Sequence, residues 1–217
     1  MAEKLADRGA EKLADSSEYR FTEEQQQLRT AVRKFCTDNF DEPTVRRLME
    51  SDVTFDAKVW NRLGAELGVL GLSVPEADGG VGGSLVDQAV AVEEFGAALA
   101  CGPLFGTVFL AIPALVSCPA GAARDALLAD LVEGTRTAAF AVVDSAGAFD
   151  VDAVAVTAGP DGLTGTVARV VDAGAADELL VAAVGPDGVG LYAVDAGAAG
   201  VSRTPLVTLD LTRPQAT

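Results

Sequence analysis

Two hydrophobic periods divide this chain. From Phe21 to about Gly134, apolar residues such as Leu28, Val32 and Phe35 recur at helical spacing. Beyond Gly134 the apolar residues fall in short alternating or β-branched runs. A period near 3.6 residues predicts amphipathic helices, and a period of two predicts strands. The sequence therefore predicts an α+β fold in which a bundle of about five helices precedes an antiparallel β domain or small barrel.

Capping residues mark where the helices begin and end. Three starts are indicated by Thr22 with Gln25, by Asp56, and by Ser84 with Asp87. Pro43 ends the first helix, and Gly68 ends the second in a left-handed conformation. Two further helices are expected after Pro103 and over residues 124–132.

Six short runs are predicted to be strands: 137–144, 152–158, 163–171, 177–184, 188–195 and 201–209. The tetrapeptide GPDG occurs at 159–162 and again at 185–188, which indicates two hairpin turns. Within 166–171, strand alternation would place Arg169 on one face with Val167 and Val171. The chain thus divides into a flexible segment at 1–20, a helical domain at 21–134 and a β domain at 135–217.

The net charge of the chain limits the classes of partner that it can bind. The 16 basic and 32 acidic residues give a net charge of −16, which repels nucleic acid and anionic membrane surfaces. The apolar stretch at 104–116 is too short to span a bilayer and contains Pro113, so a buried helix is expected there. Three cysteines without paired spacing favour a reducing cytoplasm and provide no metal site.

The chain has no histidine, which excludes catalytic triads and histidine metal sites. Carboxylates or a cofactor remain as agents of any chemistry. Glu93 and Glu94 are adjacent on a predicted helix and point about 100° apart, so we interpret them as a solvated face or a cap partner rather than an acid and base pair.

The order of several stretches resembles the acyl-CoA dehydrogenase family. The segment VLGLSVPEADGGVGGSLVDQAVAVEEFGAALA, from Val69 to Ala100, is similar to the family's GL-x-x-PEE-x-GG-x-G segment and the helix that follows it. AAFAVVDSAGAFD, from Ala138 to Asp150, resembles the strand and loop that begin the family's β domain. GTVARVVDAGAAD lies where the family has G-x-K-x-W-I-T-N-G-x-x-AD. The resemblance covers Phe21 to Thr217 and lacks the family's C-terminal helical bundle.

The resemblance implies a set of cofactor-facing positions. In the family the Trp of WIT packs on the flavin ring of FAD and the Thr hydroxyl bonds near its reactive nitrogen. Arg169, Val170 and Val171 occupy those three positions here. The set implied to face the cofactor is Phe140, Val142, Val143, Arg169 and Val171, and Phe149 faces the substrate. No catalytic or metal-binding residue is assigned.

These replacements indicate an eroded flavin pocket. Valine cannot donate a hydrogen bond, and an unpaired buried polar group costs about 1 to 3 kcal/mol. We therefore expect this chain alone to retain no FAD. Some bacterial family members, including those of sterol side-chain oxidation, pair two unlike subunits around one flavin.

Three functions follow as hypotheses. The first is a subunit of a flavin-dependent acyl-CoA dehydrogenase, an oxidoreductase that desaturates an acyl-CoA at its α,β bond with a second dehydrogenase-like subunit and an electron-transfer flavoprotein-type acceptor. In this family a carboxylate base removes the α-proton while FAD takes the β-hydride. The second is a non-catalytic structural subunit that stabilises a catalytic partner. The third is an α+β module without a ligand.

Overall fold

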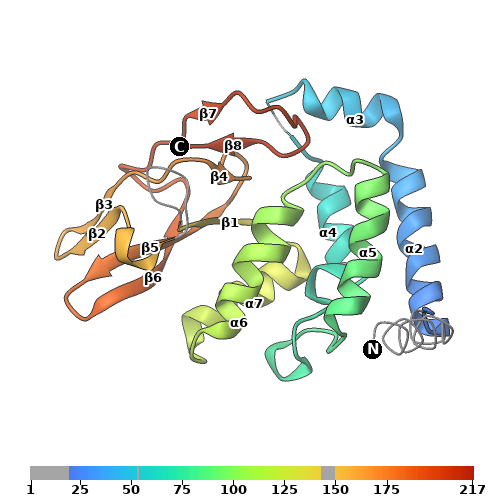
Figure 1. The fold of residues 1–217 in the computed structure, drawn as a ribbon, viewed down its shortest axis with the longest axis horizontal. Coiled ribbons are helices and arrows are strands. Elements are labelled where there is room, and N and C mark those ends of the chain that lie inside the picture. Colours follow the sequence, from blue (N-terminus) through green and yellow to red (C-terminus); the bar gives the residue numbers. More distant parts are fainter. Residues whose placement is uncertain (1–19, 53, 143–149) are drawn as a thin grey trace, which may run out of the picture.

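A computed structural model describes residues 20–52, 54–142 and 150–217 of the protein. The helices lie side by side in one half and the strands form the other half, with the segment that carries β7 and β8 running along the top (Figure 1). This arrangement confirms the predicted α+β class. The predicted flexible segment at 1–20 lies outside the described residues except for Arg20.

The first three described helices are α2 (Glu23–Asn39), α3 (Glu42–Met49) and α4 (Ala57–Ala65). The predicted capping box is confirmed at α2, where the Thr22 hydroxyl accepts from the Gln25 amide. Helix α3 was not predicted: its N-cap is Asp41, and Pro43 lies in its first turn. The N–H groups in the first turn of a helix have no hydrogen-bond partner within the helix. Pro43, which has no N–H, is therefore tolerated in the first turn of α3, just after the end of α2.

The helical half continues through α5 (Leu85–Ala97), the π-helix η4 (Leu104–Ala111), α6 (Ile112–Ser117) and α7 (Ala122–Glu133). Short 3₁₀ turns lie at η2 (Val69–Gly71), η3 (Glu76–Asp78) and η5 (Val151–Ala153). The helix expected after Pro103 is thus π-helical in its first part. Pro113 has no N–H to donate to the carbonyl four residues earlier, so a regular α-helical ladder cannot run through this position.

The larger sheet contains five strands: β1 (Ala138–Ala141), β2 (Val156–Gly159), β3 (Gly162–Gly165), β5 (Glu178–Gly185) and β6 (Gly188–Asp195). Both GPDG tetrapeptides form the predicted hairpin turns, with Gly159 opposite Gly162 and Gly185 opposite Gly188. The sheet is mixed, because β1 and β2 both run parallel to β5. The two-residue turns force β2 with β3, and β5 with β6, to pair antiparallel. The longer connections that lead from β1 and from β3 toward β5 place no such constraint on the strand direction.

The smaller sheet contains β4 (Val170–Val171), β8 (Gln215–Ala216) and β7 (Pro205–Leu206) in that order. The strand predicted at 163–171 is therefore interrupted between β3 and β4, and the strand predicted at 201–209 is reduced to two residues. The described residues from 153 to 195 contain no α-helix.

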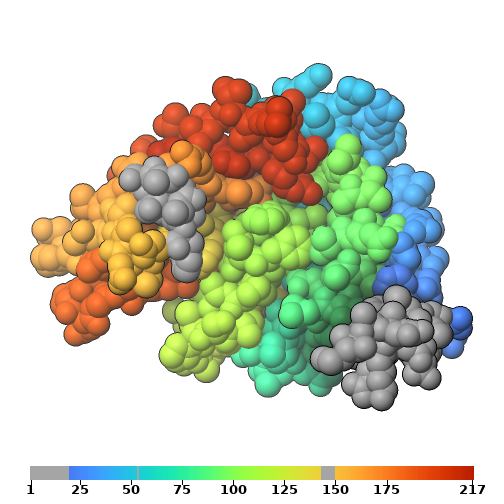
Figure 2. Space-filling view, in the orientation of Figure 1, coloured from blue at the N-terminus to red at the C-terminus, as the bar shows by residue number. Residues whose placement is uncertain are grey.

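The two faces of the larger sheet meet different surroundings. Ala138 and Leu180 pack on α6 and α7, whereas Ala139, Ala141 and Val181 pack toward the smaller sheet. This alternation along β1 follows from the two-residue period of a strand. Figure 2 shows the helical and β halves in continuous contact, with residues near the C-terminus (red) covering the upper surface.

Candidate functional site

Strands β1 and β4 carry the described residues that the resemblance assigned to the cofactor. Phe140, on β1, is partly buried against the cluster formed by α6, α7 and β5, and Val142 follows the strand and is also partly buried. Val171, on β4, is partly buried and pairs with Gln215 of β8. The two strands contact each other, so the fold brings Phe140 and Val171 into neighbouring strands. Val143 and Phe149 lie outside the described residues.

The backbone of Arg169 departs from strand geometry. Its φ of 58° lies in the left-handed region, and its side chain is exposed while that of Val170 is buried. The expectation of one regular strand through Arg169 was therefore wrong. Left-handed backbone is unfavourable for a residue with a Cβ and persists where surrounding contacts fix it.

A second left-handed residue, Asp172, follows β4 with a φ of 61°. Its carboxylate Oδ2 accepts a hydrogen bond of 2.8 Å from the backbone N–H of Gly106 in η4. Its own backbone N–H donates to the carbonyl of Pro214 at 2.8 Å. Asp172 therefore ties β4 both to the helical half and to the segment that precedes β8.

Thr107, the next residue of η4, bonds to strand β1. Thr107 is fully buried, and its hydroxyl lies 2.9 Å from both the backbone N and the carbonyl oxygen of Ala138 on β1. Gly106 and Thr107 together bind β4 and β1, and we call this arrangement the Gly106–Thr107 clasp. A Cβ on Gly106 would lie 3.1 Å from the Ala138 carbonyl oxygen and from Asp172 atoms, so the close approach depends on glycine.

Burial raises the pKa of Asp172 to about 6, although the Gly106 N–H and the Arg213 charge act to lower it. A carboxylate has a strongly raised pKa when desolvation outweighs its hydrogen bonds. The residues of β1 and η4 are apolar, Gly or Thr, so neither element places a titratable side chain beside the Asp172 carboxyl. The clasp thus contains a titratable group that changes charge near neutral pH.

Arg169 lines a hollow of about 420 Å³. Leu206 of β7, Gln215 of β8 and the loop between these strands supply the rest of the wall; the loop residues that line it are Val207, Thr208, Leu209, Asp210 and Arg213. Phe140, Val142 and Val171 do not line this hollow. The described residues of the set are therefore separated: Phe140 packs on the helix-facing side of β1, Val171 lies on β4, and Arg169 lines the hollow.

A separate cavity of about 380 Å³ lies between the two sheets. Its walls are mainly apolar, with Val156, Val170 and Val181 among them, and Arg203 at its polar side. Of the assigned cofactor-facing residues that the structure describes, none lines it. The Arg203 guanidinium donates to the carbonyls of Ala173 and Ala176, so this arginine has a structural role.

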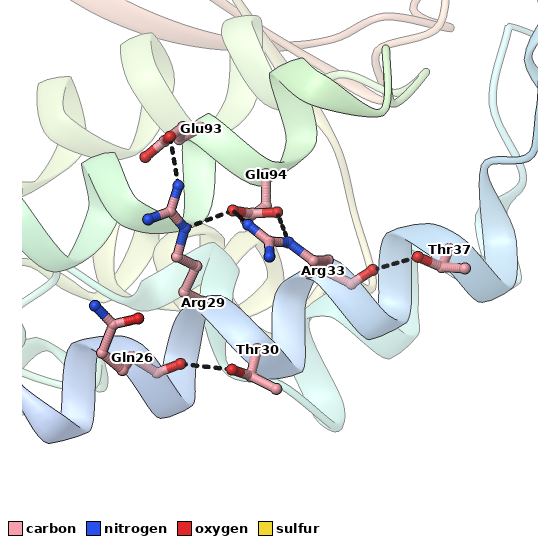
Figure 3. Close-up of polar contacts among 7 residues, drawn as sticks. All are labelled: Gln26, Arg29, Thr30, Arg33, Thr37, Glu93 and Glu94. Carbon is pink, nitrogen blue, oxygen red and sulfur yellow. Dashed lines mark hydrogen bonds and ion pairs between the residues drawn. The ribbon is translucent and has the colours of Figure 1, made fainter.

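Glu94 does not lie on a solvated face, which corrects the sequence interpretation. Its side chain is 5% exposed and accepts hydrogen bonds from Arg29 at 2.8 Å and from Arg33 at 2.7 and 2.8 Å (Figure 3). These bonds hold the pKa of Glu94 at about 2. Glu93 is 53% exposed and bonds only to Arg29 among these residues.

The spacing of Arg29 and Arg33 in the sequence is the feature that could have predicted a buried partner carboxylate. Arg29 and Arg33 are four residues apart on one face of α2, where they can bind the same carboxylate on a neighbouring helix. Because Glu94 is fully engaged by both arginines, it is poorly suited to act as a general base. The pair therefore holds α2 against α5.

The described residues offer few other chemical groups. Burial raises the pKa of the Cys36 thiol to about 12, which opposes thiolate chemistry. Within 20–52, 54–142 and 150–217, no cluster of three acidic, cysteine or histidine side chains is placed to hold a metal. None of the helices described here has the length and apolar character needed to cross a membrane.

The described residues of β4 and β1 offer few side-chain hydrogen-bond donors to a ligand. Val171 offers no side-chain donor, and Arg169 presents an exposed cation where an aromatic wall is usual in the resemblance. The side-chain hydroxyl of Thr107 is already bound to Ala138. The hydrogen bonds of Gly106 and Thr107 hold β4 and β1 against the helical half.

Comparison with known proteins identifies the family. Residues 22–135 match the family model "Acyl-CoA dehydrogenase, N-terminal domain". The chain is 37% identical over 115 residues to the acyl-CoA dehydrogenase IpdE2 of Mycolicibacterium smegmatis, covering 53% of this chain and 35% of that protein. Flavin-bound acyl-CoA dehydrogenases also share this fold.

Two solved complexes are similar across most of the chain. One is described as the Tcur3481–Tcur3483 steroid ACAD, with 35% identity, a TM-score of 0.76 and coverage of 89% of this chain and 54% of that one. The other is the ChsE4–ChsE5 complex from Mycobacterium tuberculosis, with 28% identity, a TM-score of 0.77 and coverage of 91% and 54%. The chain thus spans about a third to a half of the length of these relatives. It belongs to the acyl-CoA dehydrogenase family.

Proposed function

We propose that this chain is a non-flavin-retaining subunit of an acyl-CoA dehydrogenase that introduces a double bond at the α,β position of an acyl-CoA. Family membership supports the oxidoreductase class. Two similar solved structures are complexes of two named proteins, and one of these complexes is described as a steroid ACAD. This favours a second dehydrogenase-like subunit and a substrate of the sterol side-chain type.

The observation that carries the division of labour is the composition of β4 and of the residue before it. Arg169, Val170 and Val171 replace the aromatic and hydroxyl groups that the resemblance places against the flavin. In this proposal the unlike subunit supplies the flavin-ring pocket and the catalytic carboxylate, and this chain completes their surroundings. An electron-transfer flavoprotein-type acceptor and a cytoplasmic location complete the proposal, with domains at 21–134 and 135–217.

In this proposal the described residues of this chain contribute a rigid packing of its own elements. The Gly106–Thr107 clasp holds the helical half on β1 and β4, and the Glu94 cluster holds α2 on α5. Both contacts are buried and charged or polar, which favours one defined geometry over several. Such a rigid subunit can order a partner's site without binding the cofactor ring itself.

The test is flavin content and turnover before and after assembly. The chain purified alone should be colourless and inactive. Co-expressed with a second, unlike acyl-CoA dehydrogenase chain from the same organism, it should form a complex that holds about one flavin for each unlike pair. About one flavin for each copy of this chain alone would contradict the eroded pocket. A stable complex that oxidises no acyl-CoA would favour the structural-subunit alternative.

A further inference from the structure

The cavity between the two sheets lies where a close-packed core is expected. The larger sheet contributes Ala141, Val156 and Val181 to its wall, and the smaller sheet contributes Val170 and Ala216. These five residues are buried and belong to one apolar cluster. Protein interiors leave few voids larger than a water molecule, whereas this cavity measures about 380 Å³. Apolar cavities take up apolar molecules in preference to water.

One side of the cavity is polar. The continuous segment 200–204 supplies Ser202, Arg203 and Thr204 to the lining. Among the described residues that line the cavity, Arg203 carries the one charged side chain. The cavity therefore combines apolar walls with a single cation at its polar side, which is the usual composition of a site for a small molecule.

The guanidinium of Arg203 is fixed through one of its three nitrogens. Its Nη1 donates to the carbonyl oxygens of Ala173 and Ala176 at 3.0 Å and of Gly174 at 3.2 Å. Ala173 itself lines the cavity, so the guanidinium lies at the cavity wall. These acceptors are neutral. In the part of the chain that the structure describes, the Nε and Nη2 atoms of Arg203 make no hydrogen bond or ion pair.

Two acidic residues lie near Arg203 without pairing with it. Asp177 and Asp195 line a neighbouring hollow together with Arg203. Asp177 accepts hydrogen bonds from the backbone N–H and the hydroxyl of Thr137, and Asp195 accepts one from the Gly197 N–H. Neither carboxylate forms an ion pair with Arg203 in the described structure. The Nε and Nη2 donors are thus left for a group outside these residues.

The volume and the charge of the cavity define the class of ligand. Ligand sites measure roughly 300 to 1,000 Å³, so a cavity of about 380 Å³ suits a compact molecule rather than a whole coenzyme. The two donors on one edge of a guanidinium match the two oxygens of a carboxylate. A wholly apolar ligand gains nothing from these donors, and a cationic ligand is repelled by them. An apolar body with one carboxylate fits both the valine walls and Arg203.

We propose that the cavity between the sheets binds one amphipathic carboxylate, whose apolar body lies against the valine walls and whose carboxylate bonds to Nε and Nη2 of Arg203. The site requires neither a flavin nor a second subunit. It therefore goes beyond the proposed function and stands or fails independently of it.

Isothermal titration calorimetry of the full chain with decanoate, below its micelle concentration, tests the ligand class. The wild-type chain should bind about one decanoate. Decanol has the same chain without the charge and should bind at least about tenfold more weakly, and decyltrimethylammonium should show no saturable binding. Arg203→Gln should weaken decanoate binding by about tenfold or more, and Arg203→Lys, which keeps the charge without the paired donors, should weaken it less.

A second variant tests the cavity without changing Arg203, which also bonds to three carbonyls. Val194 on β6 is partly buried at the cavity wall, so Val194→Phe narrows the cavity. Val189 lies on the same strand, is 46% exposed and does not line the cavity, so Val189→Phe is the matched control. Val194→Phe should weaken decanoate binding by about tenfold or more, and Val189→Phe by less than about threefold. Circular dichroism checks that each variant is folded.

The outcomes separate the site from binding elsewhere. Saturable decanoate binding that both Val194→Phe and Arg203→Gln weaken supports the proposal. Absence of saturable binding to the wild-type chain overturns it. Binding that Val194→Phe leaves as tight as Val189→Phe also overturns it, because the ligand then lies outside the cavity. Equal affinity for decanol and decanoate overturns the carboxylate class, since Arg203 then contributes nothing to recognition.

Discussion

The backbone N–H of Gly106 donates a 2.8 Å hydrogen bond to the buried carboxylate of Asp172 across 66 residues of sequence. This bond joins a π-helix of the helical half to a left-handed residue that ends β4. Thr107 bonds to Ala138 of β1 at the adjacent position. The position of β4, and of Arg169 before it, therefore depends on the helical half as well as on the β half.

Asp172→Asn should remove a pH dependence of stability. The pKa of Asp172 rises from its ordinary 3.8 to about 6 in the folded chain. The folded chain then binds this proton more tightly than the unfolded chain, so its contribution is fully present below about pH 4 and is lost as the pH rises through about 6. The loss corresponds to roughly 3 kcal/mol.

Asparagine keeps an acceptor for Gly106 and cannot ionise, so the variant should lack this loss. Urea unfolding at several pH values between about 4 and 7 measures it. Asp161→Asn, in an exposed hairpin turn, is the control and should follow the wild type. Parallel pH profiles for wild type and Asp172→Asn would show that the carboxyl is not desolvated as described.

Glu94→Gln should destabilise the chain far more than Glu93→Gln. The pKa of Glu94 falls from 4.5 to about 2, so its contribution is present above pH 4.5 and is lost as the pH falls through about 2. Removing a buried carboxylate leaves two arginines without it, at a cost of roughly 3 kcal/mol at neutral pH. The half-exposed Glu93 should cost less than about 1 kcal/mol. Equal losses in urea unfolding would contradict the buried-cluster interpretation.

Two glycine substitutions should have opposite effects. Gly106→Ala places a Cβ 3.1 Å from the Ala138 carbonyl oxygen and Asp172, which should cost about 1 to 3 kcal/mol. Gly96→Ala in α5 meets nothing within 4 Å and should stabilise the helix by up to about 1 kcal/mol. Thermal unfolding of both variants beside the wild type checks the pair. If Gly106→Ala leaves the unfolding temperature unchanged, η4 and β4 can move apart without a loss of stability.

Arg169→Ala should leave turnover nearly unchanged in the assembled complex. The measurement is kcat and flavin stoichiometry at a partner concentration that saturates assembly. A charge beside the reacting centre commonly contributes several kcal/mol to a rate. A fall in kcat of tenfold or more, about 1.4 kcal/mol, would therefore show that this chain holds a working site.

The sequence by itself determined the features that depend on near neighbours. The capping boxes at Thr22 and Ser84 and both GPDG hairpins form as predicted, because each is closed by residues two to three positions apart. The change of hydrophobic period predicted helices followed by strands for the same reason. The family resemblance was also legible, since it rests on the order of short segments along the chain.

Only the tertiary structure decided which polar groups meet across the fold. Glu94 is buried because Arg29 and Arg33, more than 60 residues earlier, face it from another helix. Asp172 and Gly106 likewise meet only when η4 packs on β4, and that contact helps fix the left-handed backbone that interrupts the expected strand. Local periodicity carries no information about such partners, because the burial and pKa of a side chain depend on neighbours that folding brings from distant parts of the sequence.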